Sequence, residues 1–161
     1  MFEAESPENE SQRLAVLHGM GILDTPDEDR FDRITHLASR RFHAPVAVVS
    51  LVDAHRQWFK SCIGLPMRET PRHISFCAHV VARNALLVVH DMLQDEVFRT
   101  HPLVRETPKV RFYAGFPVHA PGGALVGTLS VADFKPRPFD VEDIEDLETM
   151  AGWVEREFAA R

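Results

Sequence analysis

A cysteine and a histidine lie two residues apart in the segment SFCAHVV. The segment begins with Ser75, a residue type that often caps a helix. Together they could form a nucleophile–base pair or bind one metal ion. On a helix, however, residues two apart point in directions that differ by about 200°, so Cys77 and His79 would not face each other. The spacing favours a core cysteine with a locally bonded histidine, or two residues that separately line a cavity.

The other residues of these types give no pattern of a metal or nucleic-acid site. The nine histidines are scattered, with no His-x-x-x-His pair, and the two cysteines form no Cys-x-x-Cys pair. The formal net charge is −6, and no Lys/Arg cluster is present to neutralise phosphates. We expect no metal and no nucleic-acid partner.

Arg111 and Tyr113 form a second candidate site, on the segment RFYAGFPV. In a strand, alternate side chains share a face, so Phe112 and Ala114 would lie on one face and Arg111 and Tyr113 on the other. A guanidinium and a phenol on a cavity wall, with Lys60 on a neighbouring strand, could bind an anionic or amide-bearing ligand. The alternative is a surface Arg111 paired with an acidic side chain.

Two helices are expected in the first 42 residues. The first would begin at Ser6 and end at Gly19 or Gly21. The second is predicted from TPDEDRFDRITHLASRRF, in which Thr25 and Glu28 have the spacing of a capping box and apolar residues recur every three or four positions.

The middle of the chain predicts an antiparallel sheet. PVAVVSLVD is a nearly continuous apolar run, typical of a strand covered on both faces, and LLVVHD also indicates a strand. RFYAGFPV and LVGTLSVADF would form a hairpin across APGG. QWFKSCIG alternates, which predicts two faces: Phe59, Ser61 and Ile63 on one, and Trp58, Lys60 and Cys62 on the other.

A long C-terminal helix should begin after Asp140, with a stripe of apolar residues at spacings of three and four. Val141, Met150 and Trp153 extend the apolar surface beyond this stripe, and such a surplus is typical of an association surface. We therefore expect a parallel homodimer built from the first and last helices. The alternative is that the first helix covers this surface within one chain.

Taken in order, MGILDTP, VSLVDAHRQWFKS, SFCAHVV, LVVHD, RFYAGFPV and GTLSVAD resemble GAF sensor domains, above all those attached to bacterial diguanylate cyclases and histidine kinases. The resemblance covers nearly the whole chain and implies one α+β domain over residues 1–161, with residues 1–10 poorly ordered. It implies a GAF/PAS-like antiparallel sheet of five or six strands. Terminal helices would pack on one face, and loops and short helices would cover a cavity on the other.

Transferred to this sequence, the resemblance implies a cavity covered by residues 75–95, with its floor on RFYAGFPV and QWFKS. The candidate lining residues are Trp58, Lys60, Phe76, Cys77, His79, Asp91, Arg111 and Tyr113. The ligand would be a small molecule, its identity and any cofactor unknown. The helix over residues 140–161 would pass the signal to an output domain or protein. The polar, acidic N-terminal segment and the lack of a long apolar run predict a cytoplasmic chain with no membrane contact.

Two alternatives to a non-catalytic sensor remain. One GAF branch reduces free methionine sulfoxide through a cysteine thiolate and a resolving cysteine, and Cys62 and Cys77 could approach each other at the cavity edge. The usual third cysteine of that branch is missing here. The other alternative is a degenerate domain whose cavity is filled by its own side chains and which serves only to dimerise.

Overall fold

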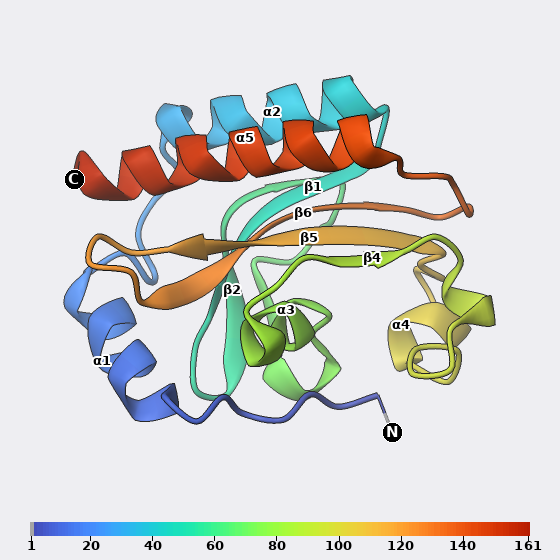
Figure 1. Ribbon diagram of the computed structural model, residues 1–161, viewed down its shortest axis with the longest axis horizontal. Helices are drawn as coiled ribbons and strands as arrows, with labels where there is room; N and C mark the ends of the chain where they lie inside the picture. The colour runs from blue at the N-terminus through green and yellow to red at the C-terminus, as the bar shows by residue number, and fades with distance from the viewer. Residues whose placement is uncertain (1) are drawn as a thin grey trace.

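The computed structural model describes residues 2–161 as a three-layer α+β fold, in which an antiparallel sheet separates two layers of helices (Figure 1). The strands are β1 (Val46–Val52), β2 (Arg56–Ile63), β3 (Glu69–Pro71), β4 (Leu87–Val89), β5 (Phe112–His119) and β6 (Leu125–Asp133). Their order across the sheet is β3-β2-β1-β6-β5-β4. The expected α+β class and the central sheet of five or six strands are confirmed.

The two central strands are covered on both faces, as their apolar sequences predict. Every residue of β1 and of β6 is buried, and the two pair in antiparallel register with Ser50 opposite Thr128. The β5–β6 hairpin turns at Gly122 and Gly123, whose φ angles of +96° and +100° are strained for residues with a side chain. The turn chemistry of APGG therefore sets the hairpin as expected.

Helices α2 (Asp29–Phe42) and α5 (Val141–Ala159) lie side by side on one face of the sheet (Figure 1). They bury a shared core, in which the rings of Phe31 and Phe158 lie 5.6 Å apart. Asp140 caps α5 as predicted, because its side chain accepts the Asp143 amide while the Asp143 carboxylate accepts the Asp140 amide. A reciprocal cap of this kind stabilises a helix by about 1 kcal/mol.

The opposite face of the sheet is covered by short elements that form a lid: η1 (Arg72–Ile74), α3 (Cys77–Arg83), η2 (Met92–Gln94) and α4 (Pro102–Arg105). A second apolar core lies between this lid and the sheet. Ser75 accepts the amide of Ala78, so the predicted cap at the start of α3 is present. Cys77, Val80 and Val81 are buried on the inner side of α3, as the helical spacing indicates.

The strict alternation predicted for β2 is wrong at one point. The register between β1 and β2 shifts at Val49/Ser50, where Val49 pairs with Ser61 and Ser50 with Phe59, so Lys60 is an extra residue. At a β-bulge two consecutive residues of one strand oppose one residue of the other. Ser61 consequently lies on the helix side, where its hydroxyl donates to Asp32 at 2.6 Å, and not on the face of Phe59.

The N-terminal helices start later than expected. Helix α1 (Glu10–Gly19) begins after Asn9 instead of Ser6, and α2 begins after Glu28 without a capping box. The reason for the second difference is Lys60, whose ammonium bonds both Thr25 and Glu28 and so occupies the two side chains expected to cap α2. In addition, α1 lies at one end of the sheet against β6, and α2 is the helix that shares a layer with α5 (Figure 1).

Candidate functional site

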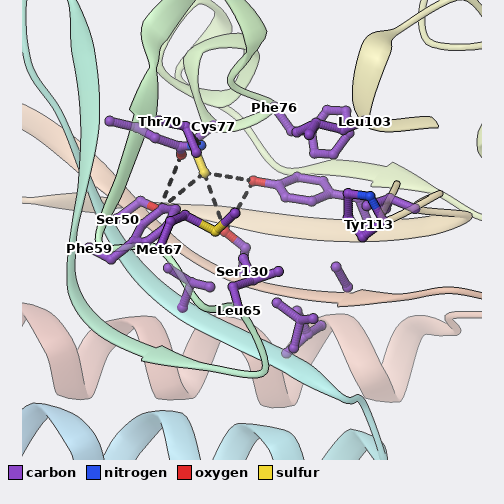
Figure 2. A pocket seen from close by; sticks show the side chains of 17 residues that line it. Ser50, Phe59, Leu65, Met67, Thr70, Phe76, Cys77, Leu103, Tyr113 and Ser130 are labelled. Atoms are coloured by element: carbon purple, nitrogen blue, oxygen red, sulfur yellow. Dashed lines mark hydrogen bonds between the residues drawn. The ribbon is translucent and has the colours of Figure 1, made fainter. Parts of the chain in front are cut away.

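A cavity of about 80 Å³ lies between the lid and the sheet. Its walls come from β1, β2, β5 and β6 below, from α3 and α4 above, and from the loop that joins β2 to β3 at one side. Most of the lining is apolar and includes Phe59, Phe76, Leu65, Met67 and Leu103 (Figure 2). The expectation of a cavity beneath loops and short helices is thus confirmed.

One end of the cavity carries a cluster of buried hydroxyl groups around a thiol. Cys77 reaches down from α3, and its sulfur lies 3.2 Å from the Tyr113 hydroxyl (Figure 2). The same sulfur lies 3.1 Å from Thr128 Oγ1. Ser50 and Ser130 lie 3.4 and 3.6 Å from the same sulfur. Because every member also bonds another group, the cluster forms a connected network of uncharged polar atoms inside an apolar chamber.

The position of the Tyr113 ring depends on Gly115. The two residues project from the same face of β5, and a Cβ atom at position 115 would lie 2.4 Å from the Tyr113 hydroxyl oxygen. Ser130 lies directly opposite Gly115 on β6 and accepts the phenol proton at 3.1 Å. Burial is the main cause that raises the pKa of Tyr113 well above its ordinary value of 10, so the phenol stays protonated at neutral pH.

The structure brings three of the eight predicted residues together at the cavity, namely Phe76, Cys77 and Tyr113. Trp58 and Lys60, by contrast, do not line the cavity as expected, because their side chains point to the opposite face of the sheet. The Lys60 ammonium is fully buried beside α2, 2.6 Å from a Glu28 carboxylate oxygen and 2.6 Å from the Pro26 carbonyl oxygen. Alternation placed these two side chains on one face correctly, but that face belongs to the helices.

The other three predicted residues surround the lid without lining the cavity. The His79 ring donates to the Phe2 carbonyl, and Asp91 caps η2 by accepting the amide of Leu93. The guanidinium of Arg111 donates to the carbonyl of Val104 at 2.8 Å and so holds the end of α4. Arg111 is neither the cavity anchor nor the acid-paired surface residue that the sequence suggested.

Sequence reasoning missed the polar side chains that belong to the strands. Ser50, Thr128 and Ser130 are buried in otherwise apolar strands, and Gln57 links Ser50 to Thr70 through its side-chain amide. A signal was present in LVGTLSVADF, because Thr128 and Ser130 are two residues apart and therefore share a face. Buried hydroxyl groups require hydrogen-bond partners, so this pair could have indicated a polar cluster.

The lining defines the electrostatics of the cavity. Among residues 2–161, no Asp, Glu, Lys, Arg or His side chain lines it.

Both cysteines are free, and burial raises the pKa of the half-buried Cys62 thiol, which disfavours its thiolate. Within the described part of the chain, no group of three or more His, Cys, Asp or Glu side chains is placed to bind a metal ion. None of the helices in this part of the chain could cross a membrane.

A single antiparallel sheet with helices on one face and a lidded cavity on the other defines a class of α+β domain. The profile of the GAF domain family matches residues 27–158, so the chain belongs to that family. The chain is also 38% identical over 146 residues to a cyclic di-GMP phosphodiesterase of Pseudomonas aeruginosa. That match covers 90% of this chain but only 25% of the relative, so the chain spans about a quarter of that protein.

Solved structures agree on the fold. A GAF domain region of a membrane protein from Geobacter sulfurreducens has a TM-score of 0.66 at 19% identity, over 94% of this chain and 98% of that one. A free methionine-R-sulfoxide reductase from Neisseria meningitidis, solved with its substrate, has a TM-score of 0.66 at 16% identity, over 99% and 96% of the two chains. The same fold therefore occurs in a GAF domain of a membrane protein and in an enzyme.

Proposed function

We propose that this chain is a non-catalytic, cytoplasmic regulatory GAF domain whose cavity binds a small uncharged molecule. The observation that carries the proposal is the cavity itself, an apolar chamber with a hydrogen-bonding end around Cys77 and Tyr113. Small-molecule sites in proteins are usually apolar with a few convergent polar groups. The relationship to a cyclic di-GMP phosphodiesterase supports a role in signalling, in which a bound ligand would alter an output domain or a partner protein.

Size and charge restrict the ligand. A cavity of about 150 Å³ holds benzene, so about 80 Å³ accommodates a molecule of only a few non-hydrogen atoms unless the lid moves. The lack of a charged side chain among the described lining residues disfavours an anion, because a buried charge without a partner is costly. A ligand with one hydroxyl, carbonyl or amide group would match the network at the polar end.

A homodimer through the helical layer is the second part of the proposal. Leu37 of α2 is 42% exposed and Val141 of α5 is 70% exposed. Leu37 lies with Met150 and Trp153 around a shallow depression between these helices. An apolar surface of this kind supports association, and α2 and α5 replace the pair of first and last helices that the sequence suggested. Sedimentation over a range of protein concentrations, compared between wild type and Leu37→Glu, would test it; a strict wild-type monomer would contradict it.

The enzyme alternative has one observation in its favour, which is that Cys77 lies in the cavity of a fold shared with a free methionine sulfoxide reductase. Against it, no cationic side chain among the lining residues stabilises a Cys77 thiolate, and burial raises the pKa of Cys62. Incubation with free methionine sulfoxide and a thiol reductant should give no turnover. Turnover that disappears in Cys77→Ser would overturn the non-catalytic assignment.

Xenon binding followed by NMR tests the cavity even while the natural ligand is unidentified, because xenon enters dry apolar cavities. Resonances of the cavity lining should shift in wild type. Ala132→Leu fills the space from β6 and should abolish the shifts, whereas Ala85→Leu, at an exposed position away from the cavity, should retain them. A thermal-shift screen of small uncharged compounds then identifies ligand classes. A protein that binds neither xenon nor any compound would be a scaffold, not a sensor.

A further inference from the structure

We propose that the cavity is the inner half of a two-chamber site whose outer half is a hollow beside α2, and that the site takes an elongated molecule with an uncharged apolar end and a primary ammonium end. This inference rests on the proposed function of the cavity. The hollow has a volume of about 380 Å³ and lies between α2, the end of β2 and the β2–β3 loop. It adjoins the cavity, since Leu65 and Met67 line both spaces.

Leu65 and Met67 form the wall between the chambers. Both side chains are half-buried, and both line the cavity together with residues of the polar cluster. The loop that carries them is fixed at its ends. Gly64 has a φ of +88° and packs against the Pro45 carbonyl, while the Arg68 carbonyl accepts the amide of Phe59 at 2.9 Å. The chambers can therefore connect through rotation of two side chains, one of them a flexible methionine, without unfolding of the loop.

The volumes favour a joint site. At about 80 Å³ the inner cavity is far below the roughly 300–1,000 Å³ typical of ligand pockets, whereas the outer hollow, at about 380 Å³, lies within that range. Joined across Leu65 and Met67, the two spaces would extend the small inner cavity into a pocket of ordinary size. A metabolite too large for the inner cavity would then fit with one end beneath the lid and the other beside α2.

The outer chamber has the charge for a cation. Asp27 pairs with Arg68 at 2.6 Å, but Asp32 forms no ion pair with a Lys, Arg or His side chain among residues 2–161. Asp32 instead accepts the Ser61 hydroxyl, which is itself held 2.8 Å from Thr35 Oγ1. Arg68, which pairs with Asp27, and His36 also line the hollow, so Asp32 is the lining carboxylate that no ion pair occupies among residues 2–161. A primary ammonium group, with its three donors, is its natural partner.

The probes are n-alkylamines from propylamine to octylamine and the n-alkanols of the same lengths, titrated at pH 7 by calorimetry. Short amines should bind more weakly than alcohols of the same length, because their charge would be buried without a partner in the inner cavity. Beyond the length that spans the wall, amines should bind about 10-fold more tightly than alcohols, the gain expected from a charge-assisted hydrogen bond. Asp32→Asn should remove this gain and leave alcohol affinities unchanged. Asp29→Asn, in the same turn of α2 but outside the hollow, is the matched control.

NMR of the Met67 methyl group provides a second measurement that needs no variant at Asp32. Hexylamine should shift both this methyl and the Asp32 region, and Met67→Ala should accelerate amine association severalfold by removing part of the wall. If alcohols and xenon bind but amines gain nothing at any length, the two-chamber site is wrong while the cavity proposal stands. If neither series nor xenon binds, the proposed function itself fails.

Discussion

The hydroxyl of Tyr113 lies 3.2 Å from the sulfur of Cys77, which joins the central sheet to helix α3 of the lid at the polar end of the cavity. The same hydroxyl donates to Ser130 at 3.1 Å, so one phenol connects the lid with β6. Any molecule that competes for these atoms changes how the lid is held on the sheet.

Tyr113→Phe removes that connection while it keeps the ring. The free energy of unfolding should fall by about 1–2 kcal/mol, because buried partners lose a hydrogen bond. Urea denaturation measures the change. Paired with Ser130→Ala in a double-mutant cycle, the substitution should show a coupling of about 0.5–1 kcal/mol, and strict additivity of the two changes would mean that the two hydroxyls do not interact.

Gly115→Ala should destabilise the protein by about 1–3 kcal/mol, because the new methyl group would overlap the Tyr113 ring in a packed core. Gly152→Ala is the matched control: a methyl group at this position of α5 would meet no atom within 4 Å, and alanine is the better helix former, so this change should stabilise by up to about 1 kcal/mol. Thermal denaturation compares the two. Equal effects at both sites would contradict the close packing described for Gly115.

The buried ammonium of Lys60 predicts an acid-sensitive contribution to stability. Its hydrogen bond to Glu28 is the main cause that lowers the pKa of that carboxyl below the ordinary 4.5. The stabilisation is therefore present above pH 4.5 and is lost as the pH falls further and Glu28 is protonated. In Lys60→Met the pKa of Glu28 should return towards 4.5, so the fall in unfolding free energy below that pH should be shallower than in wild type.

Denaturant titrations between pH 3 and pH 6 would measure this difference. Lys135→Met, at an exposed position, should follow the wild-type curve. An unchanged slope in Lys60→Met would show that the ion pair does not contribute to folding.

His101 predicts a second pH dependence, in a higher range. The ring is fully buried, and burial together with the nearby His79 lowers its pKa from 6.5 to about 4. Between these values the unfolded chain binds the proton and the folded chain does not, so stability falls as the pH drops from 6.5 to 4, by on the order of 3 kcal/mol. His101→Asn can keep the cap on the Leu103 amide, which the ring now provides at 3.0 Å, and should flatten the stability curve in this window.

Thermal melts of both proteins from pH 4 to pH 7.5 provide the comparison. A parallel pair of curves would mean that another group causes the loss of stability in this range.

Much of the fold follows from local sequence patterns. The β5–β6 hairpin is specified by paired glycines, α5 by Asp140 and its apolar stripe, and the opposite faces of Phe112 and Tyr113 by strand alternation. The three-residue strand β3, by contrast, has no sequence pattern that predicts a strand. It contains Pro71 and is too short for a period, and it forms because Gln57 and its neighbours on β2 provide hydrogen-bond partners.

The site was predictable only in part, because it depends on which face of the sheet each strand presents. Phe76, Cys77 and Tyr113 were expected at the cavity and lie there, whereas Trp58 and Lys60 lie beneath the helices. Alternation gives two faces but does not say which one receives the lid, and the bulge at Lys60 breaks the alternation itself. The extra residue, Lys60, can be recognised only once β1 and β2 are paired.

The wall of Leu65 and Met67 has a consequence for timing. In the proposed two-chamber site, a molecule that spans both chambers leaves past these side chains, so the lifetime of the occupied state would reflect how often they rotate as well as how tightly the molecule binds. Such a domain would stay in its ligand-bound state for some time after the concentration of free ligand had fallen.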